Sequence, residues 1–222
     1  MSASIVRQLV LKDLHLLRSI SVGTLAGGLV AAGLMAIAPT PIGPGGVLLI
    51  CSLVILAIFS VMNGVVQERK DNVAVFVLSL PVSPAQYLLA KVAANAIAFV
   101  GPWAVVSAAV LTIVQRSQIP TGYLPVWAAI LACVFFYYCA LLGVGLNTTS
   151  TAWHATAITV GNISVNLLIM LLFSLPSVRA HGDGATAVWT ADLVGIVAVQ
   201  LVGGIAVLGL AVALNLRRPD LV

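Results

Sequence analysis

Charged residues are scarce in this chain of 222 residues. Asp, Glu, Lys and Arg together make up 7% of the sequence, whereas hydrophobic residues make up 61%. Soluble domains average about 25% charged residues, because a surface that faces water needs polar groups. Lipid tails impose no such need, so a bilayer accepts a chain of this composition. The scarcity of charge therefore excludes an ordinary water-soluble domain.

Metal-binding and catalytic patterns are also lacking. The three cysteines, Cys51, Cys133 and Cys139, lie in apolar runs without a CxxC pair or a His at metal-ligand spacing, so we expect packing residues and no metal site. No HExxH or GxSxG motif occurs, and we assign no catalytic residue. The basic residues form no stripe with interleaved aromatics, which argues against nucleic acid as a partner.

Long uncharged runs dominate the sequence instead. Six of them are close to the roughly 20 residues that a helix needs to cross the hydrocarbon core of a bilayer. They lie at about 19–38, 47–66, 92–115, 124–146, 156–175 and 193–216. We therefore predict an all-α integral membrane protein in which residues 1–222 form a single transmembrane domain of six helices, with the lipid bilayer as its surroundings.

The basic residues predict the orientation of these helices. With the N-terminus in the cytoplasm, eight of the ten Lys and Arg residues lie on the cytoplasmic side, and only Arg116 and Arg179 lie outside. Cytoplasmic loops of membrane proteins carry an excess of Lys and Arg. Both the N- and the C-terminus are therefore predicted in the cytoplasm.

Residues 1–18 precede the first span and have an amphipathic pattern. On a helical wheel, residues 5–18 place most apolar side chains on one half and most polar ones on the other, with Asp13 and Leu11 as exceptions. This pattern predicts a helix that lies in the cytoplasmic interface of the membrane. The alternative is a plain helical extension of the first span.

The segment between the second and third spans has the most distinctive sequence. Residues 67–91 hold five of the sixteen charged residues, four of them consecutive at positions 68–71. Asp71 or the next residue is a suitable cap for a short apolar helix over 73–80. Pro81 should end this helix, because the residue before a proline avoids the α region.

The third span should begin with a capping box. Ser83 is followed by Pro84 at the first helical position and by Gln86 three residues after the cap. The predicted arrangement is thus a charged elbow and coupling helix over 67–83, a sharp turn, and re-entry into the membrane past Lys91.

These motifs follow one another in a recognisable order: Glu68-Arg69-Lys70-Asp71-Asn72, an apolar helix, Leu80-Pro81-Val82-Ser83, and Lys91. In this order they resemble the permease subunit of a type-2 ATP-binding-cassette (ABC-2) transporter. Such permeases typically show E-R-x-x-G-T, an apolar helix, L-P-V-S and a lysine. The departure lies at Asn72-Val73, where the family usually has Gly-Thr; asparagine tolerates the left-handed conformation that glycine adopts.

The resemblance implies partners and a division of labour. Permeases of this size work as dimers, with the same or a related permease, on two copies of an ATP-binding subunit. ATP and magnesium would be bound by that subunit, because this chain has no GxxxxGK[ST] phosphate loop and is not itself expected to be an enzyme. The residues expected to couple to the ATPase subunit are Glu68, Arg69, Lys70, Asp71, Val73, Phe76, Leu80, Pro81 and Ser83. The alternative is that the charged run is only a solvated loop.

Asparagines within the spans are candidates for a translocation path. Asn63 and Asn95 lie near the cytoplasmic ends of the second and third spans, and Asn162 and Asn166 are four residues apart on the fifth. A spacing of four places the last two on one helix face, and in the resembling family the second and fifth helices line the dimer interface. The alternative is interhelical hydrogen bonding, worth about 0.6–2 kcal/mol per contact.

The function that the resemblance implies is that of the membrane permease of an ATP-driven exporter in the bacterial plasma (inner) membrane. A haem-export type of small ABC permease also has six spans and is an alternative. An ATP-independent carrier or channel is another, although no charged residue lies at mid-membrane depth. The external segment 174–190 either re-enters the membrane or holds Trp189 as an interface anchor.

Overall fold

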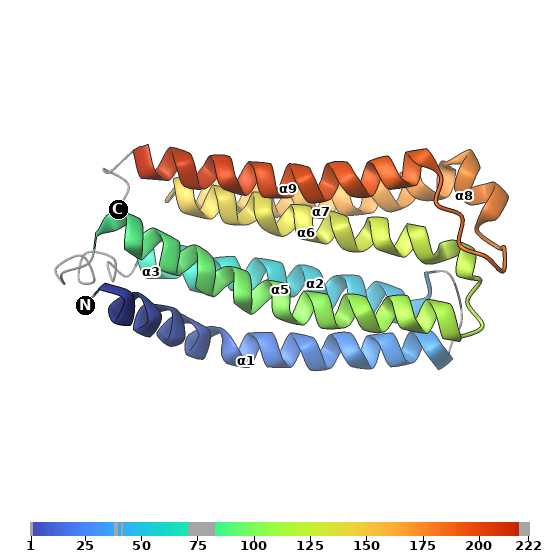
Figure 1. The fold of residues 1–222 in the computed structure, drawn as a ribbon, viewed down its shortest axis with the longest axis horizontal. Helices are drawn as coiled ribbons and strands as arrows, with labels where there is room; N and C mark the ends of the chain where they lie inside the picture. The colour runs from blue at the N-terminus through green and yellow to red at the C-terminus, as the bar shows by residue number, and fades with distance from the viewer. Residues whose placement is uncertain (1, 38–39, 41, 71–82, 218–222) are drawn as a thin grey trace.

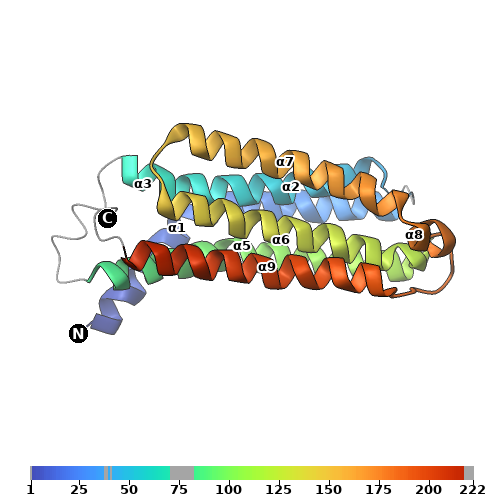
Figure 2. The same cartoon turned by 90° about the horizontal axis from the view of Figure 1, so that it is seen from above.

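Six long helices lie side by side in the structure, a computed structural model that describes residues 2–37, 40, 42–70 and 83–217, with the side chains of all these except 2–5, 69 and 70 (Figures 1 and 2). Each is part of a stretch that is long and apolar enough to cross a membrane, which confirms the predicted all-α fold with six spans. The six are α1 (Ser2–Ile37), α2 (Pro44–Val61), α5 (Pro84–Arg116), α6 (Leu124–Asn147), α7 (Thr151–Ser174) and α9 (Ala191–Arg217).

Shorter elements mark the two ends of the bundle. The π-helix η1 (Met62–Val66) continues α2, and α3 (Gln67–Lys70) follows it directly. We call the end that holds α3, the start of α1 and the end of α9 the elbow end (Figure 1). The opposite, far end holds the 3-10 helix η2 (Thr121–Tyr123) and α8 (Pro176–His181).

The first helix is continuous, unlike the predicted division into an interfacial helix over 1–18 and a span over 19–38. α1 has 36 residues without a break, which corresponds to the alternative, a helical extension of the first span. At 1.5 Å per residue it is about 54 Å long, so it exceeds the hydrocarbon core of about 30 Å. A physical reason for the continuity is that α1 packs along α5 and α2, and Asp13 is buried against this packing surface.

The third span begins at the predicted capping box. The amide of Gln86 donates to Ser83 Oγ at 3.3 Å, and the amide of Ser83 donates to Gln86 Oε1 at 3.2 Å. These two bonds satisfy backbone donors that the first turn of a helix leaves free. The sequence prediction that the helix starts at Pro84 is therefore confirmed.

The fourth span, α6, forms the centre of the bundle. In its most apolar window 78% of the residues are buried, compared with 11% in both α7 and α9. α9 and α7 pack against α6, whereas α2 and α5 pack against α1 and touch α6 as well. The large side chains of Trp127 and Tyr138 on α6 are fully buried. The outer faces of α7 and α9 are therefore left for lipid or for another protein.

Candidate coupling site at the elbow

Four charged side chains from three helices meet at the elbow end. Lys91, near the start of α5, places its ammonium nitrogen 2.8 Å from Asp13 Oδ2 of α1 and in direct ion contact with Glu68 of α3. Lys12 of α1 completes the group, with its Nζ 3.1 Å from Glu68 Oε1 and 3.5 Å from Asp13 Oδ1. We call these four residues the ion cluster.

Most of the ion cluster is shielded from water. The side chains of Lys91, Asp13 and Glu68 are all less than a tenth exposed, and only Lys12 is substantially exposed, at 44%. Burial by itself raises the pKa of Glu68, but hydrogen bonds and ion pairs with Lys91 and Lys12 outweigh it, so the pKa lies below its ordinary value. Glu68 is therefore ionised at neutral pH, and the ion cluster pairs two basic side chains with two acidic ones.

The ion cluster continues into the backbone of the second span. Lys91 Nζ donates to the carbonyl of Gly64 at 3.1 Å, and Asn95 Nδ2 donates to the carbonyl of Ser60 at 2.7 Å. The donors are four residues apart on α5 and the acceptors four apart on the second span, so one face of each helix meets the other. The π-helical turn Met62–Val66 lies at this point, and such turns are frequent at functional sites.

Asn95 carries these contacts on to the central helix. The hydroxyl of Tyr138 on α6 donates to Asn95 Oδ1 at 3.2 Å. The Tyr138 ring also stacks on Phe99 of α5, with centroids 3.9 Å apart and an interplanar angle of 6°. A β-carbon at Gly64 would collide with the Asn95 amide, so the absence of a side chain there allows the two helices to approach. The second, third and fourth spans are thus joined by one polar network.

The predicted coupling residues fall into three groups. Glu68 turns its carboxylate into the ion cluster, which gives it an internal role; its contact with an ATPase stays a prediction. Ser83 caps α5. The side chains of Arg69 and Lys70 lie outside the described residues, as do Asp71, the predicted coupling helix over 73–80 and Pro81. The remaining predicted contacts at Val73, Phe76 and Leu80 belong to this last group.

The residues predicted to line the translocation path also fall into two groups. Asn95 is buried and bonded between helices, as in the structural alternative, and Asn63 is half-buried within η1. Asn162 and Asn166 do share one face of α7, and the side-chain amide of Asn166 donates to the Asn162 carbonyl at 2.9 Å. Both line a groove of about 260 Å³ between α2 and α7. The predicted common face is therefore confirmed, and the translocation path stays a prediction.

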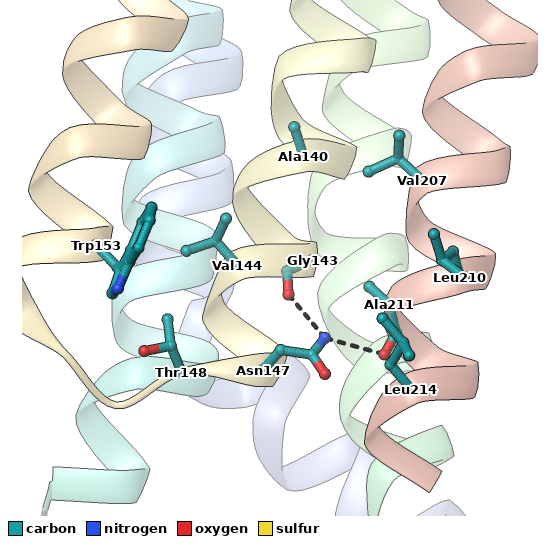
Figure 3. A pocket seen from close by; sticks show the side chains of 10 residues that line it. All are labelled: Ala140, Gly143, Val144, Asn147, Thr148, Trp153, Val207, Leu210, Ala211 and Leu214. Carbon is teal, nitrogen blue, oxygen red and sulfur yellow. Dashed lines mark hydrogen bonds between the residues drawn. The ribbon is translucent and has the colours of Figure 1, made fainter. Parts of the chain in front are cut away.

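A second pair of asparagines joins α6 to α9 at the same end. Asn147 donates to the carbonyls of Gly143 at 3.0 Å and Ala211 at 2.9 Å (Figure 3). Asn215 donates to the carbonyl of Leu146 at 2.5 Å. We call Asn147 and Asn215 the amide clamp. Above it opens a mainly apolar groove of about 480 Å³, whose lining is labelled in Figure 3: Ala140, Gly143, Val144, Asn147, Thr148, Trp153, Val207, Leu210, Ala211 and Leu214.

Sequence reasoning missed Lys12, Asp13 and the amide clamp as contact residues. One signal was present: Asp13 falls among the apolar residues of the helical wheel, and a charge on that face needs a partner of opposite sign inside the protein. Asn147 and Asn215 gave no comparable signal, because asparagine is common near helix ends.

These features define a multi-pass membrane protein with a charged elbow between its second and third spans. A family model described as ABC-2 family transporter protein matches residues 42–180. The match covers more than half of the chain, so the chain belongs to the ABC-2 transporter family. The matched region includes the elbow and the whole of α2, α6 and α7, which contribute to the two grooves. Permeases of this family associate in general with an ATP-binding subunit. No curated protein and no solved structure shows significant similarity to the chain.

Proposed function

We propose that the chain is the membrane-spanning permease of an ATP-driven ABC exporter, coupled through its elbow to a separate ATP-binding subunit. The observation that carries the proposal is the family match across residues 42–180, which includes an elbow tied to three spans by buried charges. A solvated loop would leave these charges in water. An elbow that is fixed to the membrane helices is suited to passing movement into them.

The ATP-binding subunit, in two copies, would bind ATP and magnesium and supply the hydrolysis. The sequence of this chain has no phosphate-binding loop, so the division of labour follows from the chemistry of nucleotide binding. In this proposal the elbow end faces the cytoplasm of a bacterial cell. That orientation agrees with the excess of basic residues at this end, and it puts α3, the start of α1 and the end of α9 on the side of the ATPase.

The translocation path would form where two permeases meet along α2 and α7. α7 is the least buried of the spans together with α9, yet it carries Asn162, Asn166 and the exposed Ser164. Polar side chains within a span normally face protein or a water-filled cavity rather than lipid. A second permease, either another copy or a related chain, would cover this face and enclose the groove between α2 and α7.

Purification from the native cell tests the proposal. The tagged chain is extracted in mild detergent, and the proteins that accompany it are identified and quantified. A stoichiometric ATP-binding subunit is expected. Its reproducible absence, under conditions where the chain stays folded, would contradict an ATP-driven permease and favour an ATP-independent carrier.

Coupling is then tested on the assembled complex. Phe76→Ala lies in the predicted coupling helix and should lower ATPase stimulation by the permease while membrane insertion is unchanged. Leu89→Ala is the matched control, because Leu89 is 54% exposed on α5 just beyond the elbow. Equal stimulation by both variants would show that residues 73–80 do not contact the ATPase.

A further inference from the structure

We infer that Lys91 is a positioning residue for coupling: through the ion cluster it makes the elbow ends of α1, α3 and α5 move as one unit. This inference rests on the proposed function, because it concerns how movement at the elbow enters the membrane helices. It adds a path that the elbow motif alone does not give, namely a path into the first span. It also assigns the N-terminal part of α1 a role in coupling.

The path into α1 can only be non-covalent. α3 continues through residues 71–82 into α5, so these two elements share a direct chain connection. α1 is connected to α2 at the far end of the bundle, a full membrane span away from the elbow (Figure 1). Movement at α3 therefore reaches the start of α1 through side-chain contacts there. Glu68 of α3 contacts Lys12 of α1 directly, and Lys91 bridges Glu68 to Asp13 of α1.

Lys91 occupies the centre of this arrangement. One ammonium group contacts a carboxylate from α1, a carboxylate from α3 and, at 3.1 Å, the carbonyl of Gly64 at the end of the second span. An ammonium has three donors, and these three partners can use all of them. It also lies 5.9 Å from the ring centroid of Tyr87, within the range of a cation–π contact. The side chain of Lys91, which belongs to α5, thus contacts residues of α1, α3 and η1.

Charge makes this junction resist separation more than apolar packing does. Apolar side chains can slide past one another while staying buried. If α3 moved away alone, Glu68 would lose both of its lysine partners; if α1 moved away alone, Lys91 would lose Asp13 and Glu68 would lose Lys12. Breaking a buried ion pair in a region shielded from water is strongly unfavourable. Movement of the three ends together keeps every pair intact. The cluster therefore favours a concerted displacement over separate ones.

The position along the membrane suits this role. α5 has 33 residues and is about 50 Å long at 1.5 Å per residue, whereas its long uncharged run, residues 92–115, begins only after Lys91. Lys91 therefore lies at the border between the hydrocarbon core and the elbow. Four residues deeper, Asn95 bonds to Ser60 and Tyr138. The ion cluster thus receives movement at the surface, and the Asn95 contacts pass it to the second and fourth spans.

The test separates this role from simple stabilisation. Lys91→Met leaves two buried carboxylates with only the half-exposed Lys12 as a cation partner, so it is expected to lower both stability and coupling and does not discriminate. The triple variant Lys91→Met, Asp13→Asn, Glu68→Gln removes the buried charges together and should recover the melting temperature. Its remaining cation, Lys12, is 44% exposed and tolerates the loss of partners. Lys91→Arg keeps the positive charge and is the conservative rescue.

Each variant is assembled with the ATP-binding subunit that accompanies the wild-type chain, and its ATPase stimulation is compared with its melting temperature. The triple variant is expected to melt like the wild type but to stimulate hydrolysis about tenfold less, a change typical of coupling between distant sites. Lys91→Arg is expected to retain most of the stimulation. A triple variant that recovers both quantities would overturn the inference and leave the proposed function intact.

Distances between spin labels give a direct measure of concerted movement. Leu11 of α1 and Leu89 of α5 are 53% and 54% exposed, and they are labelled in one permease copy per assembly after replacement of the three native cysteines. In the wild type their separation should stay constant between the nucleotide-free and ATP-trapped states, and in the triple variant it should change. A constant separation in both proteins would overturn the inference. A wild-type chain that binds no ATP-binding subunit would remove the proposed function and, with it, this inference.

Discussion

Two groups of helices are each held together at the elbow end, but by different chemistry. α1, α3 and α5 meet through the ion cluster, in which three of the four charged side chains are buried. α6 and α9 meet through the amide clamp, in which each asparagine donates to a carbonyl of the opposite helix. Both arrangements lie at the same end, so the difference is one of chemistry and not of surroundings.

This difference teaches what each junction is suited to do. A neutral amide donates to a backbone carbonyl and holds two helices at one separation, with about 0.6–2 kcal/mol per contact in membranes. A buried charge cluster is only marginally favourable overall, yet it becomes strongly unfavourable when one member is taken away. The amide clamp therefore holds only α6 and α9 together. In the ion cluster, by contrast, the loss of one charge destabilises the contacts of every helix that contributes a charge.

Removal of the central cation should have the largest effect. Lys91→Met is expected to lower the free energy of unfolding by about 3–5 kcal/mol, because the buried Asp13 and Glu68 lose their buried cation and keep only Lys12, which is 44% exposed. Thermal unfolding in mild detergent measures this loss. Leu89→Met, on the exposed side of the same helix, is the control and should unfold like the wild type. Equal melting temperatures of the two variants would show that the loss of a charge from the ion cluster is not strongly destabilising, and the contrast with the amide clamp would fail.

Loss of the amide below the ion cluster should have an intermediate effect. Asn95→Leu leaves the carbonyl of Ser60 and the hydroxyl of Tyr138 buried with one partner fewer. An unsatisfied buried polar group costs about 1–3 kcal/mol, and the melting temperature should fall accordingly. Ile97→Leu serves as the control, since Ile97 is 54% exposed on the same helix. A stability equal to that of the control would mean that the contact between α5 and α6 depends on packing alone.

The amide clamp should give a smaller and independent effect. Asn215→Ala is expected to cost about 0.6–2 kcal/mol through loss of its bond to Leu146. Combined with Lys91→Met, the two losses should add to within about 0.5 kcal/mol, because the two junctions share no partner. A double-mutant cycle measures this. Strong coupling between the two substitutions would show that the halves of the bundle act as one unit after all.

The smallest effect is expected on lowering the pH, because this neutralises a carboxylate and leaves its side chain in place. The pKa of Glu68 in the folded protein lies below the ordinary value of 4.5. Its contribution to stability is therefore present above pH 4.5 and is lost as the pH falls through the folded-state pKa. The gap in melting temperature between the wild type and Glu68→Gln should be constant near neutral pH and close in acid. A gap that persists in acid would show that hydrogen bonding, not charge, stabilises the cluster.

Local patterns were sufficient for the fold. Spans were predictable because a helix of fixed rise must match a fixed bilayer thickness, and this requirement is met within each segment. The start of α5 was predictable because Ser83 and Gln86 are three residues apart, so the cap depends only on neighbours. The pairing of Asn162 with Asn166 followed for the same reason from helical periodicity.

The candidate site was predictable only in part. Glu68 and Lys91 stood out in the motif, but their contact did not follow from it, because 23 positions separate them in the chain. Asp13 appeared as a misplaced charge on the wheel without a named partner. The helix predicted over 1–18 continues into the first span without a break, and its interfacial position stays a prediction, since amphipathic periodicity describes a face and does not say whether lipid or protein covers it.

The sequence by itself determined six spans, a charged elbow and the capped start of the third helix, because hydropathy, charge distribution and capping act over a few residues. Only the tertiary structure decided that Lys12 and Asp13 of the first helix join Glu68 and Lys91, and that Asn147 and Asn215 fasten α6 to α9. These contacts depend on which helices lie side by side and how they are rotated. Helix packing sets both, through close approaches such as that at Gly64, and no local pattern records them.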